Sequence, residues 1–370
     1  MYLENLNLVN FKNYQWLDLA LEPDINCIVG ENGSGKTNLL DAIHYLSMTK
    51  SAFNAVDQQS ISHGEEFFTI KGTFQKDSKK NMVQCTLQQG QKKFMKVNGA
   101  VSEKMRDHIG EFPVVLIAPN DTDLIREGSE TRRKYFDSLL SQLNRDYLYQ
   151  LVDYYSAMRQ RNALLKRFQE KNFFEKDLLE GYDNIMLEKG RKLHHYRASF
   201  TLNFKPLLNK NYKIISGGKE SIDISYKSDF EAPDFQLRFK GCLEKDLKLQ
   251  RSTFGTHTDD FVFSINGRPL KKYGSQGQQK SMIVALKLAH YETMKMEKSI
   301  RPILLLDDIF DKLDEPRMRH LLSMVSEKSF GQILITDARP ERTLTLVKNL
   351  EAKIGVFEID RGSLRNRNTL

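Results

Sequence analysis

One octapeptide near the start of the chain has the residue types and spacing that bind phosphate groups. Residues 30–37 read GENGSGKT, which fits the pattern G-x-x-x-x-G-K-[ST], and they follow the apolar run INCIV at 25–29. In this pattern the glycines let backbone N–H groups turn inward around phosphates, and the helix that follows adds a favourable dipole. Lys36 would place its charge on the β and γ phosphates of a nucleotide, and Thr37 would offer its hydroxyl to Mg²⁺. The sequence therefore predicts a nucleotide-binding phosphate loop.

Two carboxylates stand at the end of a second apolar run. Residues 303–308 read ILLLDD, so Asp307 and Asp308 leave the carboxyl end of a predicted buried strand. In a parallel α/β sheet this end faces the same edge as the phosphate loop. Asp307 would then hold Mg²⁺ through its water shell, and Asp308 could orient and polarise an attacking water. Paired aspartates at an ordinary strand exit are common, so this interpretation depends on the phosphate loop.

A third stretch, SQGQQKS at 275–281, gathers small and amide residues at the start of the predicted helix 282–294. Ser275 and Gly277 would permit close backbone approach to an anion, and a helix N-terminus favours negative charge. An elaborate N-cap would explain the same composition.

The hydrophobic pattern predicts the elements that position these motifs. Uninterrupted apolar runs predict buried strands, alternation predicts half-exposed strands, and spacings of three and four predict helices. Strands are expected within 16–22, 25–29, 66–74, 82–88, 93–97, 114–119, 220–227, 260–265, 303–308 and 332–337, with Asn-Gly turns at 98–99 and 266–267. Helices are expected at 36–48, 131–168, 176–208 and 282–294, and the last nine residues are expected to be frayed and basic. This order predicts an α/β head formed by 1–122 and 211–370, interrupted by a helical lobe at 123–210.

Length and composition restrict the class of protein. The chain has 370 residues, 40% of them hydrophobic, which allows a large core and two structural units. It has no run of eighteen apolar residues and no signal-peptide pattern, and its three cysteines lie far apart, so we expect a cytoplasmic protein. The net charge is +8, and residues 123–210 carry 17 basic and 12 acidic residues, a difference of +5. This excess favours a polyanionic partner.

The order of the three motifs resembles that of ATP-binding-cassette (ABC) ATPases, in which the Ser-Gly loop docks on the γ-phosphate held by a partner subunit. Longer segments resemble the RecF family of DNA replication and repair proteins, which is related to the SMC ATPases. These segments are LVNFKNY (8–14), GKTNLLDAIHYL (35–46), APND (118–121), ETRRKYFD (130–137), YLYQLVDYYSAMRQRNALLKRF (147–168), GTHTDD (255–260), SQGQQKS (275–281) and LLLDDIFDKLD (304–314). The resemblance implies an ABC-type P-loop ATPase head with an inserted α-helical lobe.

The resemblance also assigns roles to positions of this sequence. It implies an ATP site formed by Gly30, Glu31, Asn32, Gly33, Ser34, Gly35, Lys36 and Thr37. It implies Mg²⁺ ligands at Thr37 and Asp307, catalytic roles for Lys36 and Asp308, and a basic residue near the phosphates at Lys12. Across a dimer it implies contacts by Ser275, Gln276, Gly277 and Gln278, with Asp311 and Asp314 at the subunit contact.

By the same resemblance, the protein is expected to be an ATP-dependent homodimer that hydrolyses ATP slowly. It would bind single-stranded and gapped duplex DNA, and would act with RecR and RecO to help RecA replace single-strand-binding protein. The sequence departs from the family pattern at Lys312, at residues 51–54 (SAFN), and at Thr336-Asp337, where related ATPases have a switch histidine.

Other functions share some of these features. The ATPase subunit of a membrane transporter has the three motifs but a shorter helical insert, and an SMC-type chromosome ATPase has hundreds of heptad residues between them. A non-catalytic DNA adaptor would not need the hydrolytic residues. His257, Asp259 and Asp260 have the wrong spacing for a closed zinc site, so we expect them to form structural hydrogen bonds. The clusters at 132–134 and 166–167 either contact phosphates or solvate the helical lobe.

Overall fold

Residue contacts divide the chain into two units in the computed structural model, which describes residues 1–171, 173–218, 220–308, 330–347 and 350–369. The first unit comprises Met1–Asp121 and Leu286–Leu370, and the second comprises Thr122–Ala285. Helix α9 (Gln276–Lys298) belongs to both, because the division falls within it. Within the described ranges, no helix combines the length and the apolar character needed to cross a membrane.

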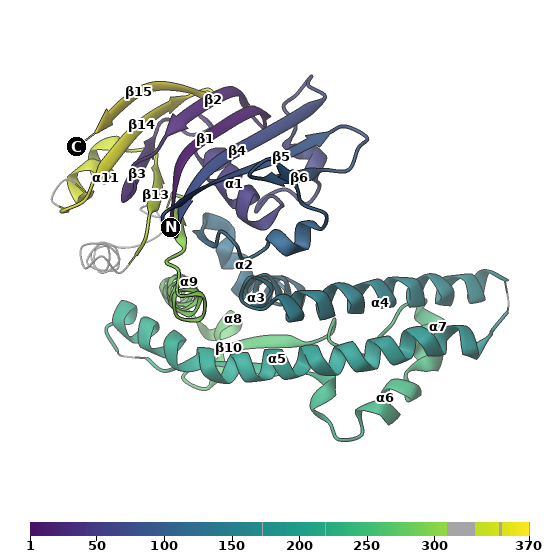
Figure 1. The fold of residues 1–370 in the computed structure, drawn as a ribbon. Coiled ribbons are helices and arrows are strands. Elements are labelled where there is room, and N and C mark those ends of the chain that lie inside the picture. The colour runs from purple at the N-terminus through teal and green to yellow at the C-terminus, as the bar shows by residue number, and fades with distance from the viewer. Residues whose placement is uncertain (172, 219, 309–329, 348–349, 370) are drawn as a thin grey trace. The chain divides into compact units, whose positions relative to one another are not determined.

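The first unit contains two six-stranded sheets with helix α1 (Lys36–Met48) packed against strands of both (Figure 1). One sheet is antiparallel, in the order β2-β1-β4-β5-β6-β7. Its strands are β1 (Tyr2–Phe11), β2 (Tyr14–Ala20), β4 (Phe67–Lys76), β5 (Lys79–Gln88), β6 (Phe94–Val97) and β7 (Ala100–Val101). Alternating burial along β4 and β5 places one face on the core.

The other sheet has the order β15-β14-β3-β13-β12-β8, and all neighbours are parallel except β14 and β15. Its strands are β3 (Ile25–Val29), β8 (Val114–Ile117), β12 (Ile303–Leu306), β13 (Ile333–Asp337), β14 (Ile354–Asp360) and β15 (Ser363–Thr369). Helix α11 (Pro340–Val347) packs on β3. Strands β3, β12 and β13 are buried at every residue, as expected for parallel strands that are covered on both faces.

The second unit pairs long helices with a small antiparallel sheet (Figure 1). Its helices are α2 (Asp123–Arg126), α3 (Ser129–Leu143), α4 (Arg145–Lys171), α5 (Lys176–Ser216), α6 (Phe235–Gly241), α7 (Leu243–Leu249) and α8 (Leu270–Tyr273). Its sheet has the order β11-β10-β9, from β9 (Ile222–Lys227), β10 (Asp260–Ile265) and β11 (Arg268–Pro269). Helices α4 and α5 pack along each other, α5 packs on β9, and α3 packs on β10.

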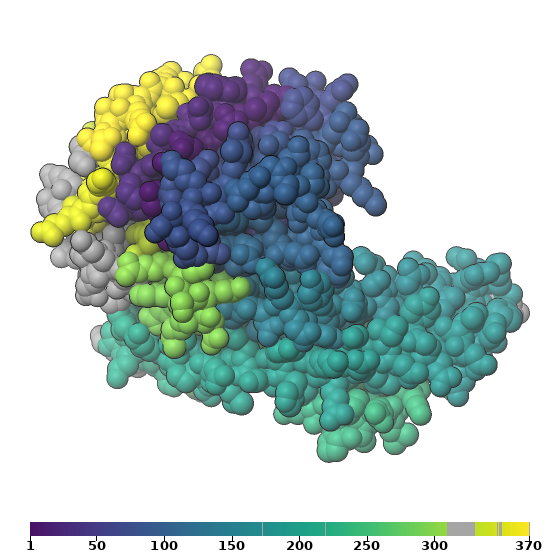
Figure 2. Space-filling model, in the orientation of Figure 1, coloured from purple at the N-terminus to yellow at the C-terminus, as the bar shows by residue number. Residues whose placement is uncertain are grey.

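The structure confirms most of the predicted elements and differs at three places. The single helix predicted at 131–168 is two helices, because Asn144 adopts an extended backbone and its side-chain Oδ1 accepts the Tyr147 N–H at 3.1 Å. The C-terminal residues predicted to fray form β15, which the backbone of β14 holds in place although its side chains are mostly exposed. In Figure 2 these yellow residues lie beside the purple N-terminal strands of the same unit.

The predicted boundary at residue 210 also differs from the observed division. Residues 211–285 belong with the helices and not with the head, because β9 and β10 pair with each other and pack on α5 and α3. The two Asn-Gly turns are confirmed, since Asn98, Gly99, Asn266 and Gly267 all have positive φ.

Candidate nucleotide site

The phosphate loop connects the carboxyl end of β3 to the first residue of α1, as the sequence predicts. Glycine is required at two of its positions. Gly30 has φ 153°, and a Cβ there would lie 2.2 Å from the Ile359 carbonyl oxygen. Gly35 has φ 118°, and a Cβ there would lie 2.5 Å from the Asn13 amide nitrogen. Only a residue without a side chain fits these two positions, so the loop can turn its backbone toward a ligand.

Two buried polar side chains give the loop its chemistry. Lys36 is 4% exposed, and its Nζ donates to the carbonyl oxygens of Gly30 at 2.8 Å and Glu31 at 2.9 Å. Ser34 is 3% exposed, and its hydroxyl has no hydrogen-bond partner among the described residues. A buried polar group without a partner is costly. A phosphate at the loop would satisfy the Ser34 hydroxyl and neutralise the Lys36 ammonium, so these residues fit a nucleotide.

Residues of the β1–β2 turn support the loop from outside, and the sequence motifs did not identify them as part of the site. The Tyr14 hydroxyl donates to the Gly35 carbonyl at 3.0 Å, and the Asn13 amide donates to the Ser34 carbonyl at 3.0 Å. Asn38 in turn donates to the Asn13 amide oxygen at 2.8 Å. Burial raises the pKa of Tyr14, so its hydroxyl remains a donor at neutral pH. The segment LVNFKNY contained the only sequence signal for these residues.

Asp307 lies beside the phosphate loop, as its place at the end of β12 predicts. The Thr37 hydroxyl lies 2.9 Å from Asp307 Oδ1 and 3.0 Å from Oδ2. Asp307 is 3% exposed, and burial raises its pKa, whereas hydrogen bonds from Thr336 and Thr37 lower it. A hydroxyl and a carboxylate are hard oxygen ligands, which suit Mg²⁺. Thr37 and Asp307 would therefore hold that ion, and the ion would neutralise phosphate charge.

One hydroxyl organises both aspartates. Thr336, at the end of β13, is fully buried, and its Oγ1 donates to Asp307 Oδ1 at 2.8 Å. The same Oγ1 accepts the backbone N–H of Asp308 at 3.0 Å. Asp308 has φ 43°, in the left-handed region that residues other than glycine seldom adopt. Such conformations concentrate at functional sites. The sequence singled out Thr336 only as a departure from the family pattern, and the structure gives it this supporting position.

The resemblance implied that Lys12 lies near the phosphates, but its ammonium pairs with a carboxylate instead. Lys12 Nζ lies 2.7 Å from Asp41 Oδ2, and the two side chains are 9% and 0% exposed. Asp41 also accepts from the Ser51 hydroxyl at 2.6 Å and the Ala52 N–H at 2.7 Å. Lys12 and Asp41 therefore anchor the segment 51–54 to the first unit.

In the second unit, SQGQQKS begins helix α9 with reciprocal hydrogen bonds. The Ser275 N–H donates to Gln278 Oε1 at 2.7 Å, and the Gln278 N–H donates to Ser275 Oγ at 3.2 Å. This is a capping box, so the N-cap interpretation describes the geometry correctly. It does not exclude anion binding, because Ser275 and Gln276 are exposed. The predicted subunit-contact residues Asp311 and Asp314 lie outside the described residues.

Several basic residues of the family-like segments are engaged inside the second unit. Arg132 forms two hydrogen bonds with the Asp260 carboxylate at 2.8 and 3.0 Å, and Arg133 donates to the Asp259 carbonyl at 2.6 Å. Arg161 is 1% exposed and pairs with Asp183 at 2.5 Å and Asp246 at 2.6 Å. Arg132, Arg133 and Arg161 therefore stabilise the second unit from within. In the clusters at 132–134 and 166–167, the exposed residues are Lys134, Lys166 and Arg167.

Arg197 is a second fully buried arginine in this unit. It pairs with Asp137 and Asp259, both at 2.7 Å, and donates to the Thr256 carbonyl at 2.7 Å. His257, next to this cluster, has the structural role that the sequence predicts. Its Nδ1 lies 2.8 Å from the Tyr154 hydroxyl and its Nε2 lies 3.0 Å from the Ser252 carbonyl. No group of three metal-ligating side chains occurs among the described residues.

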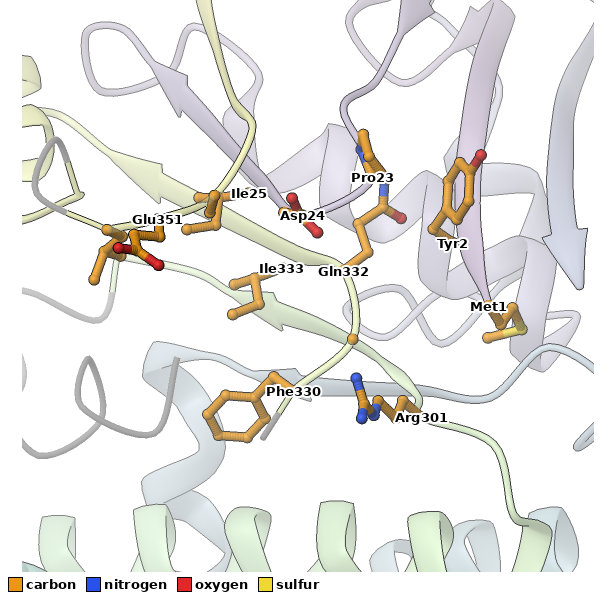
Figure 3. A pocket seen from close by; sticks show the side chains of 13 residues that line it. Met1, Tyr2, Pro23, Asp24, Ile25, Arg301, Phe330, Gln332, Ile333 and Glu351 are labelled. Atoms are coloured by element: carbon orange, nitrogen blue, oxygen red, sulfur yellow. The ribbon is translucent and has the colours of Figure 1, made fainter. Parts of the chain in front are cut away.

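The first unit contains a cavity of about 300 Å³, whose lining side chains Figure 3 shows. None of the described residues that line it belongs to the phosphate loop. It is lined by residues at the amino ends of β3 and β13, among them Asp24, Ile25 and Ile333, whereas the phosphate loop follows the carboxyl end of β3. The Gln332 side chain also lines the cavity. Its Oε1 accepts the Leu3 N–H at 2.7 Å, and its Nε2 donates to the Leu3 carbonyl at 2.8 Å.

A phosphate loop after β3 and a carboxylate after β12 that contacts it through Thr37 are the features of an ATP-binding, ATPase-type domain. A family model described as "RecF/RecN/SMC N terminal domain" matches residues 2–364. The chain is 44% identical over 359 residues to the DNA replication and repair protein RecF of Flavobacterium johnsoniae, covering 97% of this chain and 100% of that one. It is 42% identical to the RecF of Cytophaga hutchinsonii, covering 98% and 96%. A solved structure of the recombination mediator protein RecF with ATP superposes with a TM-score of 0.89 at 29% identity, covering 100% of this chain and 97% of that one.

The chain belongs to the RecF family. The fold class inferred from the sequence, an ABC-type head interrupted by a mainly helical unit, is therefore confirmed.

We expect Lys36→Met to lose most of its affinity for ATP. The variant keeps an unbranched apolar stem that ends at Cε but removes the ammonium, whose hydrogen bonds to charged groups are worth about 1.5–3 kcal/mol. Titration calorimetry should therefore show an affinity roughly ten- to 150-fold weaker than that of the wild type. The matched control is Lys92→Met, an exposed lysine of the same unit, which should bind ATP normally. Wild-type affinity in Lys36→Met would refute the assignment of the loop.

Proposed function

We propose that this protein is an ATP-dependent DNA-binding protein of recombinational repair and replication-fork maintenance. It binds single-stranded and gapped duplex DNA as an ATP-gated homodimer and acts with RecR and RecO to help load RecA. Its slow, DNA-stimulated ATP hydrolysis acts as a switch and not as a metabolic reaction. The observation that carries the proposal is the contact between Thr37 and Asp307, which joins the phosphate loop to the acidic strand end across 270 positions of sequence.

The residues around this contact supply the parts of a hydrolytic mechanism. Lys36 and the loop N–H groups bind the β and γ phosphates and stabilise charge that develops on them. Mg²⁺, when bound, adds charge neutralisation at the same oxygens. Asp308 orients a water molecule and accepts its proton during attack on the γ-phosphate. Thr336 keeps the two aspartates in place, because it bonds to the carboxylate of Asp307 and to the backbone of Asp308.

The exposed start of α9 supports the dimer. The first N–H groups of a helix have no partner within the helix, and its dipole favours an anion. Ser275 is exposed, and its Oγ accepts from Gln278, so its hydroxyl proton is available to an outside acceptor. The γ-phosphate at the phosphate loop of a second copy has the matching charge. The dimer would then form only when ATP is bound, so the nucleotide would control dimerisation.

The distribution of charge supports a nucleic-acid partner and suggests one stretch for the phosphate contacts. Three arginines of residues 123–210 are buried, Arg133, Arg161 and Arg197, but only one acidic residue in the described part of this range is, Asp137, so the +5 balance overstates the charge available to DNA. Residues 261–286 contain Arg268, Lys271, Lys272 and Lys280 and no carboxylate. This stretch includes the start of α9, so phosphate contacts there would lie next to the loop that responds to ATP.

Ser275→Arg tests the gate. The variant should bind ATP at its own phosphate loop with wild-type affinity but should not dimerise, because a guanidinium does not fit where a small residue approaches a phosphate. Sedimentation with ATP measures dimerisation, and a gel shift on gapped DNA measures binding. The matched control is Ser199→Arg, at an exposed position of α5, which should dimerise normally.

The salt dependence of DNA binding gives an independent measurement. Each phosphate contact contributes about 0.9 to the slope of log affinity against log salt on duplex DNA. The wild type with ATP should therefore have a steeper slope than the wild type without nucleotide or Ser275→Arg with ATP. Three equal slopes, together with unchanged ATP affinity, would show that DNA binding does not depend on the dimer, and the proposal would fail.

A further inference from the structure

One carboxylate connects the long helix α5 to the start of α9. Glu220 lies between them, after the end of α5 at Ser216. The hydroxyl of Tyr212, a residue of α5 that is 1% exposed, donates to Glu220 Oε2 at 2.5 Å. The side-chain amide of Gln278 donates to Glu220 Oε1 at 2.6 Å. Both oxygens of Glu220 are therefore occupied, one by each helix.

This carboxylate decides the orientation of the Gln278 side chain. The two ends of a glutamine amide are nearly isosteric, so an unconstrained amide can present either its oxygen or its nitrogen. An ionised carboxylate only accepts hydrogen bonds, so the Gln278 Nε2 must face Glu220. The Gln278 Oε1 must then face the opposite way, toward the Ser275 N–H at 2.7 Å. Glu220 thereby selects the one amide orientation that closes the capping box.

The capping box holds Ser275 at two atoms, its backbone N–H through the Gln278 amide oxygen and its Oγ through the Gln278 backbone N–H. Ser275 Oγ accepts the Gln278 N–H at 3.2 Å, which occupies one of its lone pairs. A hydroxyl has one proton to donate, and the bond in which Ser275 Oγ accepts leaves that proton unused. Ser275 is exposed, so it offers a hydrogen-bond donor to an anion beside the helix start.

We infer that Glu220 is a positioning residue for the SQGQQKS loop, acting through Gln278 on Ser275 and joining the loop to α5 through Tyr212. This inference rests on the proposed docking of Ser275 on the γ-phosphate of a partner copy, and it adds the residue that prepares Ser275 for it. Tyr212 is a buried residue near the end of the 41-residue helix α5, so the two hydrogen bonds of Glu220 give that helix a direct connection to the loop. DNA bound along α5 would then change the affinity of the SQGQQKS loop for the γ-phosphate of the partner copy.

Two substitutions at residue 220 separate positioning from simple packing. Glu220→Leu removes both hydrogen bonds and frees the Gln278 amide to turn over. Glu220→Gln keeps the shape and can still accept from Gln278 when its nitrogen donates to Tyr212, but an amide no longer enforces that orientation. We expect ATP-dependent dimerisation, measured by sedimentation, to be about tenfold weaker or worse in Glu220→Leu, the effect of losing a charged hydrogen bond. Glu220→Gln should dimerise more weakly than the wild type and more strongly than Glu220→Leu, because it keeps the hydrogen bonds but not the selection of orientation.

The affinity of each variant for ATP at its own phosphate loop is the second readout, measured on the same samples by titration calorimetry. A role confined to folding would weaken both properties, whereas positioning weakens dimerisation alone. Tyr212→Phe keeps the Gln278 contact and loses the hydrogen bond that connects Glu220 to α5, so DNA should stimulate its ATPase less than that of the wild type. This variant also provides a test if Glu220→Leu does not fold.

The outcomes distinguish this inference from the proposal on which it rests. If Ser275→Arg abolishes dimerisation while Glu220→Leu dimerises like the wild type, Glu220 does not position the loop and the inference fails alone. Dimerisation that is normal in both variants would refute docking by Ser275 itself. Normal DNA stimulation in Tyr212→Phe would overturn the connection to α5.

Discussion

Asp308→Asn should bind ATP normally and lose nearly all turnover. A positioned general base contributes about 10²–10⁴-fold to a rate, and asparagine removes the charge while keeping the shape of the side chain. The backbone should not change, because Asp308 has φ 43° and asparagine tolerates the left-handed region well. The backbone N–H of residue 308 can still donate to the Thr336 hydroxyl. Single-turnover hydrolysis of ATP, measured beside ATP affinity, gives the result.

This variant should also accumulate as an ATP-bound dimer, because ATP holds the two subunits together and is no longer hydrolysed to release them. The matched control is Asp18→Asn, an exposed aspartate of β2, which should hydrolyse ATP at the wild-type rate. Turnover at the wild-type level in Asp308→Asn would mean that another group activates the water. The phosphate loop and Asp307 would keep their assignments in that case.

Arg197→Met should destabilise the second unit by about 3–5 kcal/mol, because it leaves buried carboxylates without their counter-ion. Arg197 is fully buried and bonds to Asp137, Asp259 and the Thr256 carbonyl. Burial already raises the pKa of Asp259, and the Arg197 charge is the main influence that opposes this. Urea unfolding followed by a probe in the second unit measures the change in the free energy of unfolding.

The matched control for this prediction lies on the same helix. Arg191 is exposed on α5, and exposed substitutions usually change stability by no more than about 0.5 kcal/mol. Arg191→Met should therefore unfold close to the wild type. Equal stability of Arg197→Met and Arg191→Met would show that the buried ion pairs contribute no net stabilisation.

The sequence by itself determined the chemistry of the phosphate loop and the elements that flank it. Helix α1 has the predicted bounds at 36–48, and the apolar runs that became β3, β12 and β13 were all predicted as buried strands. These features are local, because a glycine pattern, an apolar run and a helical period each act within about ten residues. The place of Asp307 beside Thr37 was also predictable, since carboxyl ends of parallel strands meet at one edge of a sheet.

Only the tertiary structure showed which polar side chains form ion pairs and hydrogen bonds within the fold and which can contact a ligand. Lys12 looked like a phosphate contact but pairs with Asp41. Arg161 and Arg197, which the sequence analysis counted only within the charge of residues 123–210, are buried in ion pairs with aspartates 22 to 85 positions away. Asn144 ended a helix that periodicity predicted to continue, because its side chain caps the next one.

The same holds for the residues that support the candidate site. Thr336 reaches Asp307 and Asp308 from a neighbouring strand, and Glu220 reaches Gln278 from 58 positions earlier in the chain. A hydrogen bond depends on the positions of two groups within about 3 Å, and their separation in sequence carries no information about that distance. Sequence patterns therefore reveal the groups that act on a ligand, whereas the groups that hold them in place become visible only in the folded chain.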